Sequence, residues 1–518
     1  MIFFDKAVIK ISLERTAIVY LILCFLFPSS KFVYAQQIDG CLDSGNACNI
    51  LVSATPQLSE EGLSTHATVK DAAGDITALV GSGNATVSYI SGLLQPYVTG
   101  NVNAVSTSNA IAETCLNKDN SKRVEEDCRV LLNAALQGDS HTTSALLQIM
   151  PRFVRRANNV ARAGGVVQIN NLKSRIKALR NGSRGLSFQG LDLKIYNQKL
   201  PIGKITSAYE KLRIQKSSLS AEQLRLDSSF GMFFTGDIIT NKNSLADPES
   251  ELNFDTNGVT LGADYRLTER LVLGSALGYI DTNSTLINGK GNLDTEGYSI
   301  SFYGTYIGRK PYFIDFATSY GVNNIDQRRL ISYQLDDIGW VNQEMTANYN
   351  SDKFSLFFGS GYDFKNNFWT FGPRMDLQYI KSYVGGFTEQ SSDSSALGSG
   401  WVTRSSAINR HWLTWNLGGT LSYKQVMHWG TFEPYSRFDW LHEFKDETQL
   451  LDTYFIYDTQ GNAIPVVTSD PDRDYLRLKV GTSAKFKRGL EAYFNYGTLF
   501  AQSGWTGRTV KIGFRMEL

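Results

Sequence analysis

The chain has 518 residues and a formal net charge of +1, so it lacks the basic excess expected of a nucleic-acid-binding protein. Aromatic residues make up 12% of the chain, with 25 Tyr and 29 Phe, and they lie mainly in its second half. After roughly the first 40 residues there is no apolar run of about 18 residues, which excludes a membrane-spanning helix from that part.

Residues 1–35 have the features of a secretory signal peptide. A basic start is followed by the apolar run Ala17–Phe27, and Val33-Tyr34-Ala35 offers small residues for cleavage before Gln36. The alternative is a short membrane anchor, for which the apolar run is short. We therefore expect transport through the Sec translocon and removal of residues 1–35.

Apart from Cys24 in the predicted signal, the chain has four cysteines, which are Cys41, Cys48, Cys115 and Cys128. An even number in an exported chain favours disulfide bonds. Three connectivities are possible, and we favour Cys41 with Cys48 and Cys115 with Cys128 because this pairing closes the shortest loops. A zinc site is the alternative, but the spacings do not fit one. We expect no metal and no cofactor.

Residues 36–160 are polar and rich in Ala, Ser, Thr and Asn, with weak helical patterning. We interpret them as a short exported region. Residues 161–228 are interpreted as a linker that contains a better helix, from about Val167 to Leu179. Its apolar residues fall three or four positions apart with basic residues between them, and Asn181-Gly182 ends it. The apolar positions are Ile169, Leu172, Ile176 and Leu179.

From residue 229 to residue 518 the apolar period changes to two, which is the period of a β-strand. In one such segment Val259, Leu261, Ala263 and Tyr265 alternate with Thr260, Gly262 and Asp264. Short connections alternate with long polar ones, as in outer-membrane barrels. The pattern predicts a mainly β fold, an antiparallel transmembrane β-barrel of about 12 strands. A large soluble β-sandwich is the alternative, but it would not place aromatic residues so regularly at strand ends.

Alternation also assigns faces within the predicted barrel. The polar, lumen-facing side carries the carboxylates Asp264, Asp315, Asp363 and Asp376. The last strand is expected to pair with the first and to turn its apolar face to the lipid of the outer membrane. Its apolar residues are Val510, Ile512, Phe514, Met516 and Leu518.

Several segments of residues 229–518 resemble the C-terminal translocator domain of bacterial autotransporters, the type V secretion family. The stretch Val259–Tyr279 resembles the second and third strands of such domains. Gly386-Phe387-Thr388-Glu389 and the stretch Pro434–Phe444 are further elements of this kind, and the alternating last strand resembles the signal read by the barrel-assembly machinery. Family members usually end in Phe or Trp, whereas this chain ends in Leu518.

The resemblance implies a helix that threads the pore. The segment Gln168–Arg180 resembles that helix, with Ile169, Asn170, Asn171, Leu172, Arg175, Ile176 and Leu179 as its residues. Its basic face is expected to pair with the lumen carboxylates. Asn170-Asn171 resembles the cleavage dipeptide of the self-cleaving subgroup, but we favour a plain polar helix face.

The resemblance further implies that the chain exports its own N-terminal region to the cell surface from the bacterial outer membrane. We expect a monomer that is not an enzyme and that binds no nucleic acid. One alternative is a porin-like barrel plugged by the N-terminal region. Another is an esterase, because Gly138-Asp139-Ser140-His141 resembles a GDSL nucleophile block. That block follows a helical run and lacks a later Asp-x-x-His, so a loop at a helix end is the simpler interpretation.

Overall fold

The computed structural model describes residues from 86 to 517, with gaps. The described residues are 86–98, 100–183, 185–190, 193–195, 198–200, 229–243, 252–286, 290–335, 339–445, 449–468, 472–486, 490–500 and 508–517. The predicted signal peptide, Cys41 and Cys48 lie outside these ranges.

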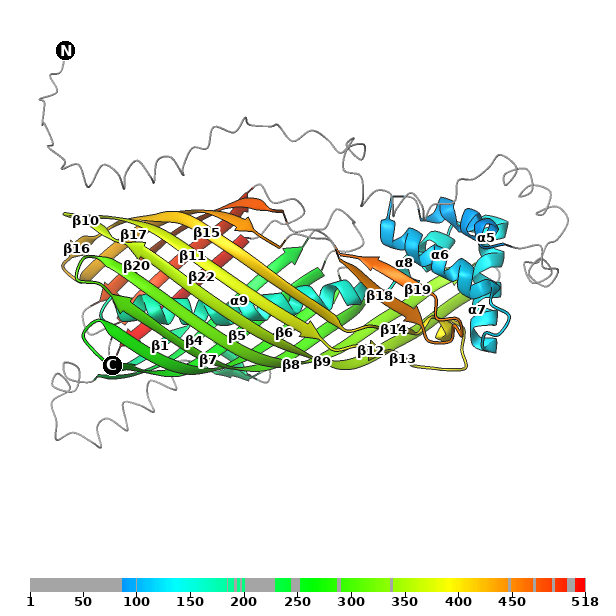
Figure 1. The fold of residues 1–518 in the computed structure, drawn as a ribbon, viewed down its shortest axis with the longest axis horizontal. Coiled ribbons are helices and arrows are strands. Elements are labelled where there is room, and N and C mark those ends of the chain that lie inside the picture. Colours follow the sequence, from blue (N-terminus) through cyan, green and yellow to red (C-terminus); the bar gives the residue numbers. More distant parts are fainter. Residues whose placement is uncertain are drawn as a thin grey trace, which may run out of the picture. The chain divides into compact units, whose positions relative to one another are not determined.

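Within the described residues, five α-helices precede the strands, and the first four lie within residues 86–150 (Figure 1). Thr86 and Asn101 cap two of them, because their side-chain oxygens accept hydrogen bonds from backbone N–H groups of the first turn. Gly138 ends a third in the left-handed region, at a φ of 80°. The helices are α5 (Val87–Leu94), α6 (Val102–Leu116), α7 (Lys122–Gln137), α8 (Thr142–Ile149) and α9 (Arg152–Arg180), and the 3-10 turn η1 (Gln95–Tyr97) follows α5.

Twelve long strands are found within the described residues, and they confirm the predicted barrel architecture. They are β4 (Phe230–Asn243), β5 (Leu252–Arg266), β6 (Leu271–Leu286), β7 (Gly291–Ile307), β8 (Tyr312–Leu335), β9 (Gly339–Tyr362), β11 (Trp369–Val384), β15 (Ile408–Tyr423), β17 (Gly430–Glu443), β20 (Asp474–Phe486), β21 (Leu490–Phe500) and β22 (Arg508–Glu517).

Shorter elements accompany the long strands. After α9 in the sequence come β1 (Gly185–Gly190), β2 (Leu193–Ile195) and β3 (Gln198–Leu200). At turns lie β10 (Phe364–Asn366) and β16 (Gln425–Met427). In long connections lie β12 (Phe387–Thr388), β13 (Gln390–Ser391), η3 (Ser399–Trp401), β14 (Thr403–Ser405), β18 (Leu450–Phe455) and β19 (Ala463–Val467).

The strand pairings return to their starting point and so close a ring. Neighbours pair antiparallel from β4 to β9, then from β9 through β11, β15, β17, β20 and β21 to β22. Between β22 and β4 lies the short strand β1, antiparallel to β22 and parallel to β4. The sequence did not indicate this strand, which falls in the stretch expected to be a linker.

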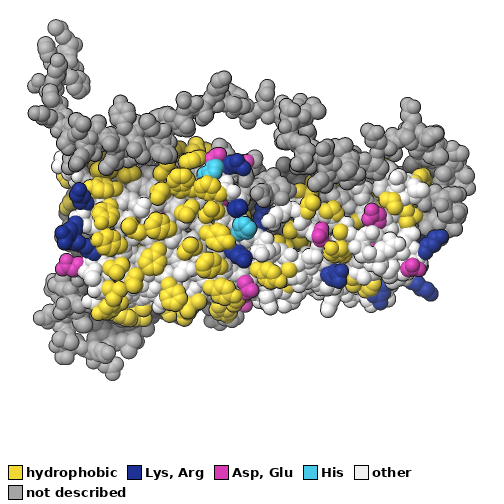
Figure 2. Space-filling view, viewed as in Figure 1, with side chains coloured by type: hydrophobic (Ala, Val, Ile, Leu, Met, Phe, Trp, Pro, Cys, Tyr) yellow, Lys and Arg dark blue, Asp and Glu magenta, His cyan; other side chains and the backbone are white. Residues whose placement is uncertain are grey.

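The outward faces of the strands carry a broad apolar band. On β8 the exposed residues Tyr312, Ile314, Phe316, Tyr320 and Val322 alternate with buried ones. Figure 2 shows apolar side chains spread over the strands, with charged side chains concentrated at the ends of that region. Such a band is expected where strands face lipid.

Beyond this band the hairpin of β8 and β9 continues with a polar outward face. Asn324, Asp326 and Arg328 take the exposed positions on β8, and Asn348 and Asn350 take those on β9. At about 3.3 Å per residue, the stretch from residue 323 to 335 extends on the order of 40 Å along the strand. On the buried side of this extension, Ile331, Tyr333 and Leu335 share a hydrophobic core with the helices.

Helices α5 to α8, residues 86–150, are called the helical cap here. The cap shares one hydrophobic core with the hairpin extension, η3, β18 and β19. The sequence indicated only weak helical patterning here, because much of the apolar surface that stabilises these helices belongs to distant segments. No helix in the described part of the chain is both long enough and apolar enough to cross a membrane.

Candidate functional site

The long helix α9 lies in the barrel lumen and packs against one part of its wall. Its nearest strands are β4 to β9 and β11 (Figure 1). The predicted apolar residues Ile169, Leu172, Ile176 and Leu179 are all buried. They pack with lumen-facing residues of β4, β6, β7, β8 and β9, which are Phe233, Val272, Ala276, Tyr303, Ala317 and Phe357. The helix begins at Arg152, well before the expected start near Val167.

Arg175 forms the most buried ion pair between α9 and the wall. Its Nε and Nη2 donate to the two carboxylate oxygens of Asp264 on β5, at 2.7 and 3.0 Å. The side chains are only 1% and 4% exposed. Tyr303 Oη also donates to Asp264, at 2.8 Å, and Arg175 Nη1 donates to Ser183 Oγ at 3.1 Å. A buried bidentate pair with such additional hydrogen bonds fixes the rotation of the helix.

Two further basic residues of α9 reach predicted carboxylates. Lys173 Nζ donates to Asp376 Oδ2 on β11 at 3.0 Å, and Arg180 pairs with Asp315 on β8. The fourth predicted carboxylate, Asp363, pairs with Arg374 on β11 instead of with α9. Asp264, Asp315 and Asp376 therefore bind the helix, as the basic face predicted.

A second charged group lies on β17 and β20. Arg437 and Arg477 both bind Asp439, at 2.7 and 2.9 Å, and Arg437 also reaches Asp376 at 3.3 Å. Farther along α9, Arg162 donates to Glu443 on β17 at 2.7 Å. Hence this side of the lumen meets α9 mainly through long charged side chains.

Amide and hydroxyl groups complete the polar contacts of α9. Asn171 Nδ2 donates to Thr260 Oγ1 at 2.9 Å, and Thr260 in turn donates to Gln168 Oε1. Gln168 Nε2 donates to Ser301 Oγ at 3.1 Å. These bonds give Asn171 a packing role on a polar helix face, in line with the simpler interpretation of the Asn170-Asn171 pair.

Small residues let α9 approach the wall closely. A Cβ added at Gly164 would lie 2.5 Å from Ile280 Cδ1 and 2.7 Å from Lys353 Nζ. A Cβ added at Gly258 on β5 would overlap Val167 Cγ1 and lie 3.6 Å from Val167 Cβ. At both places the backbone of a glycine therefore packs directly against a side chain of the opposite element.

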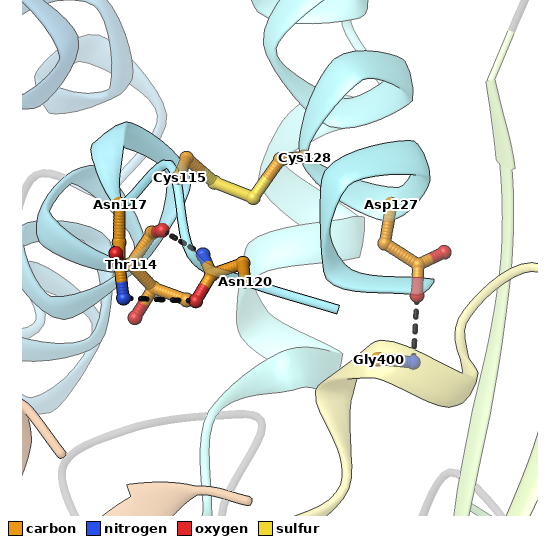
Figure 3. Close-up of a disulfide and its surroundings, with 7 residues drawn as sticks. All are labelled: Thr114, Cys115, Asn117, Asn120, Asp127, Cys128 and Gly400. Carbon is orange, nitrogen blue, oxygen red and sulfur yellow. Dashed lines mark hydrogen bonds between the residues drawn. A yellow bond between two sulfur atoms is a disulfide. The ribbon is translucent and has the colours of Figure 1, made fainter. Parts of the chain in front are cut away.

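The cap contains a disulfide bond between Cys115 on α6 and Cys128 on α7, with an S–S length of 2.00 Å (Figure 3). Next to it, Asn117 Nδ2 donates to Asn120 Oδ1 at 3.1 Å and to Thr459 Oγ1 in a barrel loop at 2.8 Å. The pairing of Cys41 with Cys48 stays a prediction.

Arg329 on β8 joins the cap to the barrel, and sequence reasoning missed it. Its guanidinium binds both carboxylate oxygens of Glu389, at 2.9 and 2.5 Å. It also donates to the main-chain oxygens of Gln148 and Ile149 at the end of α8. Glu389 belongs to the predicted family element at 386–389 and also accepts from Thr403 N and Oγ1. Only its neighbourhood in the fold reveals the role of Arg329.

Asp127 on α7 makes a second connection between cap and barrel. Its two carboxylate oxygens accept from the backbone N–H groups of Gly398 and Gly400, at 2.5 and 2.7 Å, and Figure 3 shows the Gly400 contact. Burial raises the pKa of Asp127 to about 6, although these two hydrogen bonds act in the opposite direction.

The esterase-like block forms the turn between α7 and α8. Asp139 Oδ1 accepts from His141 N at 2.8 Å and lies 3.0 Å from His141 Nδ1. Among the described residues, no group of three His, Cys, Asp or Glu side chains is arranged to hold a metal ion.

Strand β22 contains four of the predicted C-terminal signal residues, Val510, Ile512, Phe514 and Met516. It pairs antiparallel with β21 and β1. Their side chains and Leu518 lie outside the described part, so their recognition by an assembly factor stays a prediction.

Comparisons with known proteins place this architecture in a family. The model of the family described as Autotransporter beta-domain matches residues 232–497, just over half of the chain. Outer membrane protein A of Rickettsia rickettsii is 25% identical over 308 residues, 56% of this chain, and that of Rickettsia conorii is 29% identical over 156 residues. The chain spans only 13% and 8% of the length of these two relatives.

Solved barrels are also similar to the chain. The translocator domain of the autotransporter NalP from Neisseria meningitidis is 12% identical with a TM-score of 0.41, covering 61% of this chain and 98% of that one. The β-domain of the Bordetella autotransporter BrkA is 17% identical with a TM-score of 0.38, covering 56% and 100%. The match to the family model extends from β4 to β21. Because it covers more than half of the chain, this outer-membrane protein belongs to the autotransporter β-domain family.

Proposed function

We propose that the chain exports its own N-terminal region through the barrel and displays it at the cell surface. Membership in the autotransporter β-domain family supports export. The observation that carries the proposal is the placement of α9. This helix precedes the barrel strands in the sequence, lies in the lumen and binds three lumen carboxylates. A chain that had passed through the barrel would leave such a segment in the lumen.

The proposal assigns a role to each part of the chain. Residues 1–35 direct the chain to the Sec translocon, residues 36–160 are exported, and residues 161–228 link them to the barrel of residues 229–518. The barrel-assembly machinery folds the barrel and recognises the final strand. The protein acts as a monomer and carries out no enzymatic reaction.

The connections between strands support an orientation. Outer-membrane barrels have short turns on the periplasmic side and longer loops outside. The turns at 267–270 and 308–311 are short and lie at the end of the barrel where α9 ends, near Asp315. The cap contacts the opposite end, where the connections at 385–407 and 444–473 are long. The cap therefore lies on the outward side.

The test is protease accessibility on intact cells with an epitope tag inserted at Ser53. A matched control carries the same tag in the short turn at Lys310, which the orientation places in the periplasm. We expect external protease to remove the tag at Ser53 and to leave the tag at Lys310 untouched. Permeabilising the outer membrane should expose the second tag.

Protection of the Ser53 tag until the membrane is permeabilised would overturn the proposal. The N-terminal region would then lie in the periplasm or lumen, as in a plugged porin-like barrel. Removal of both tags from intact cells would overturn the orientation.

A further inference from the structure

We infer that the barrel completes the fold of its own helical cap, and that the cap stays on the barrel as a lid and is not released. The inference rests on the proposed export and goes beyond it, because export alone leaves the fate of residues 86–150 open. Three independent sets of contacts support it.

The first is the shared hydrophobic core. Ile90, Leu94, Ile111, Leu131 and Leu146 of the cap are buried. The same core contains Ile331, Tyr333, Leu335, Val341, Met345, Trp401, Val402, Phe455 and Ile464, which come from the hairpin extension and the long loops. A segment of about 65 residues buries only about 60% of the surface of its unfolded chain and is marginally stable by itself. Removing the barrel part would expose the apolar faces of the helices.

The second is the buried guanidinium of Arg329. It is bound on one side by Glu389 of the barrel and on the other by two carbonyl oxygens at the end of α8. The Arg329 and Glu389 side chains are only 3% and 2% exposed. Without the cap, the carbonyl oxygens of Gln148 and Ile149 are lost and the guanidinium keeps only Glu389 and the Trp401 oxygen, so docking of α8 completes the hydrogen bonding of an existing charge.

The third is a set of side chains of the cap that bind the backbone of the loops. Asn103 accepts from Val467 N at 2.7 Å and donates to Val467 O at 3.3 Å, as a neighbouring strand would. Asp127 binds Gly398 and Gly400, and Asn117 binds Thr459. These contacts involve two different connections, 385–407 and 444–473, so the cap recognises the assembled outward end of the barrel.

The order of the chain gives the inference a consequence for export. The cap precedes α9, so it leaves the lumen before α9 can occupy its final position. Its complete core exists only where the outward hairpins are already present. The lid therefore forms on the far side of the membrane, and its docking opposes movement back into the lumen.

Limited trypsin digestion of intact cells tests the inference. Lys118 in the α6–α7 connection and Lys122 at the start of α7 are exposed and lie inside the loop closed by the Cys115–Cys128 disulfide. Cleavage there releases fragments only after reduction, so reducing and non-reducing gels identify the site. We expect this connection to resist trypsin while the Ser53 tag is removed from the same cells.

The variant Arg329→Met should increase cleavage at the connection by about a hundredfold, because it leaves the Glu389 carboxylate buried without its cation. A milder variant, Asn103→Ala, should increase cleavage by about tenfold and keeps the test informative if Arg329→Met fails to fold. The matched control is Glu126→Gln, which breaks an exposed pair with Arg129 on the same cap and should change little.

The outcomes separate this inference from the proposed function. Removal of the Ser53 tag with rapid cleavage at the connection of the unmodified chain overturns the lid but leaves export intact. Accumulation of residues 86–150 in the medium does the same. Protection of both sites on intact cells overturns export itself. Resistance that is unchanged by Arg329→Met and by Asn103→Ala, in barrels shown to be folded, also overturns the lid.

Discussion

The two sides of the lumen hold α9 by different means. On the side of β4 to β9, lumen-facing side chains such as Thr260, Ser301 and Thr305 are fully buried, and the helix packs at backbone distance. On the side of β17 and β20, Arg437 and Arg477 are each 21% exposed, and Lys173 of the facing helix is 25% exposed. The strands β4 to β9 hold the helix by close packing, whereas β17 and β20 face it with charged side chains that are partly exposed to water.

The difference shows how a lumen can be both filled and polar. Tight packing around the whole helix would require every polar group to find a protein partner, since unpaired buried groups are costly. Here the tightly packed side pairs its buried charges, as in Arg175 with Asp264. The other side leaves its cations partly in water, where partners are less important.

The largest effect is expected when a charge on the tightly packed side loses its partner. Arg175→Met leaves Asp264 buried with Tyr303 as its remaining donor, and we expect it to destabilise the folded protein by about 3–5 kcal/mol. Urea unfolding of the refolded protein in detergent micelles measures this loss. The matched variant Lys173→Met removes a partly exposed cation, and Asp376 keeps its bond to Arg437, so it should cost about 1 kcal/mol. Equal losses would contradict the comparison.

Deletion of an apolar contact on the same side should have the next largest effect. Leu172→Ala removes a fully buried side chain, and a cavity at such a site costs about 2–5 kcal/mol. The counterpart is Lys177→Ala on the opposite face of α9, where the lysine lies over the Tyr435 ring at 5.1 Å. We expect that variant to stay within about 0.5 kcal/mol of the unmodified chain. Both values come from the same unfolding assay.

The sequence revealed these elements to different degrees. The barrel strands and the carboxylates Asp264, Asp315 and Asp376 could be predicted, because a period of two assigns each residue to a face from local information alone. The second half of α9 could be predicted for the corresponding reason at a period near 3.6. The half that begins at Arg152 could not, since Gly164-Gly165 weakens helix propensity and the segment is stabilised by the surrounding strands.

The connections between cap and barrel depend on partners far apart in the sequence. Arg329 meets Gln148 and Glu389 only in the folded protein, at separations of 181 and 60 residues. A lone arginine on a strand has no local signal for such a role. The helices α5 to α8 were indicated only weakly for the same reason, because the extended hairpin supplies part of their core.

Outside the membrane, pH tests the rule that a buried charge is costly. Burial raises the pKa of Asp127 to about 6 in the folded protein, from 3.8 when it is unperturbed. The folded state therefore holds the proton more tightly, so this group stabilises docking at low pH and loses that effect as the pH rises through 6. We expect docking of the cap to strengthen by on the order of 1 kcal/mol from pH 7 to pH 5. Hydrogen exchange of α7 amides at the two pH values measures this, and Asp127→Asn should remove the pH dependence.

The smallest expected effect concerns the passage of ions along the side of the lumen formed by β17 and β20, and it is measured as a current. The carboxylates Asp439 and Glu443 are fully buried, whereas the cations around them are partly exposed, so this side should favour anions. The double variant Val167→Cys with Gly258→Cys should lock α9 to β5, because the Cβ separation of 3.6 Å suits a disulfide. In planar bilayers we expect a small anion-selective current even through this locked protein.

Lys177→Glu in the locked protein should shift the reversal potential towards cation selectivity. Loss of all current on locking would show that any conductance requires displacement of the helix. The side of the lumen formed by β17 and β20 would then be closed to ions, contrary to the comparison.

The short strand β1 has a consequence for the dimensions of the ring. It follows directly after α9 and occupies the seam over only six residues, with one neighbour parallel and the other antiparallel. Since β22 and β4 run antiparallel to each other, they could also join directly without β1. Withdrawing β1 would shorten the circumference by one strand spacing, about 4.8 Å, and narrow the diameter by about 1.5 Å. The seam thus sets the bore of the barrel, and the strand that fills the seam follows directly on the helix that occupies the lumen.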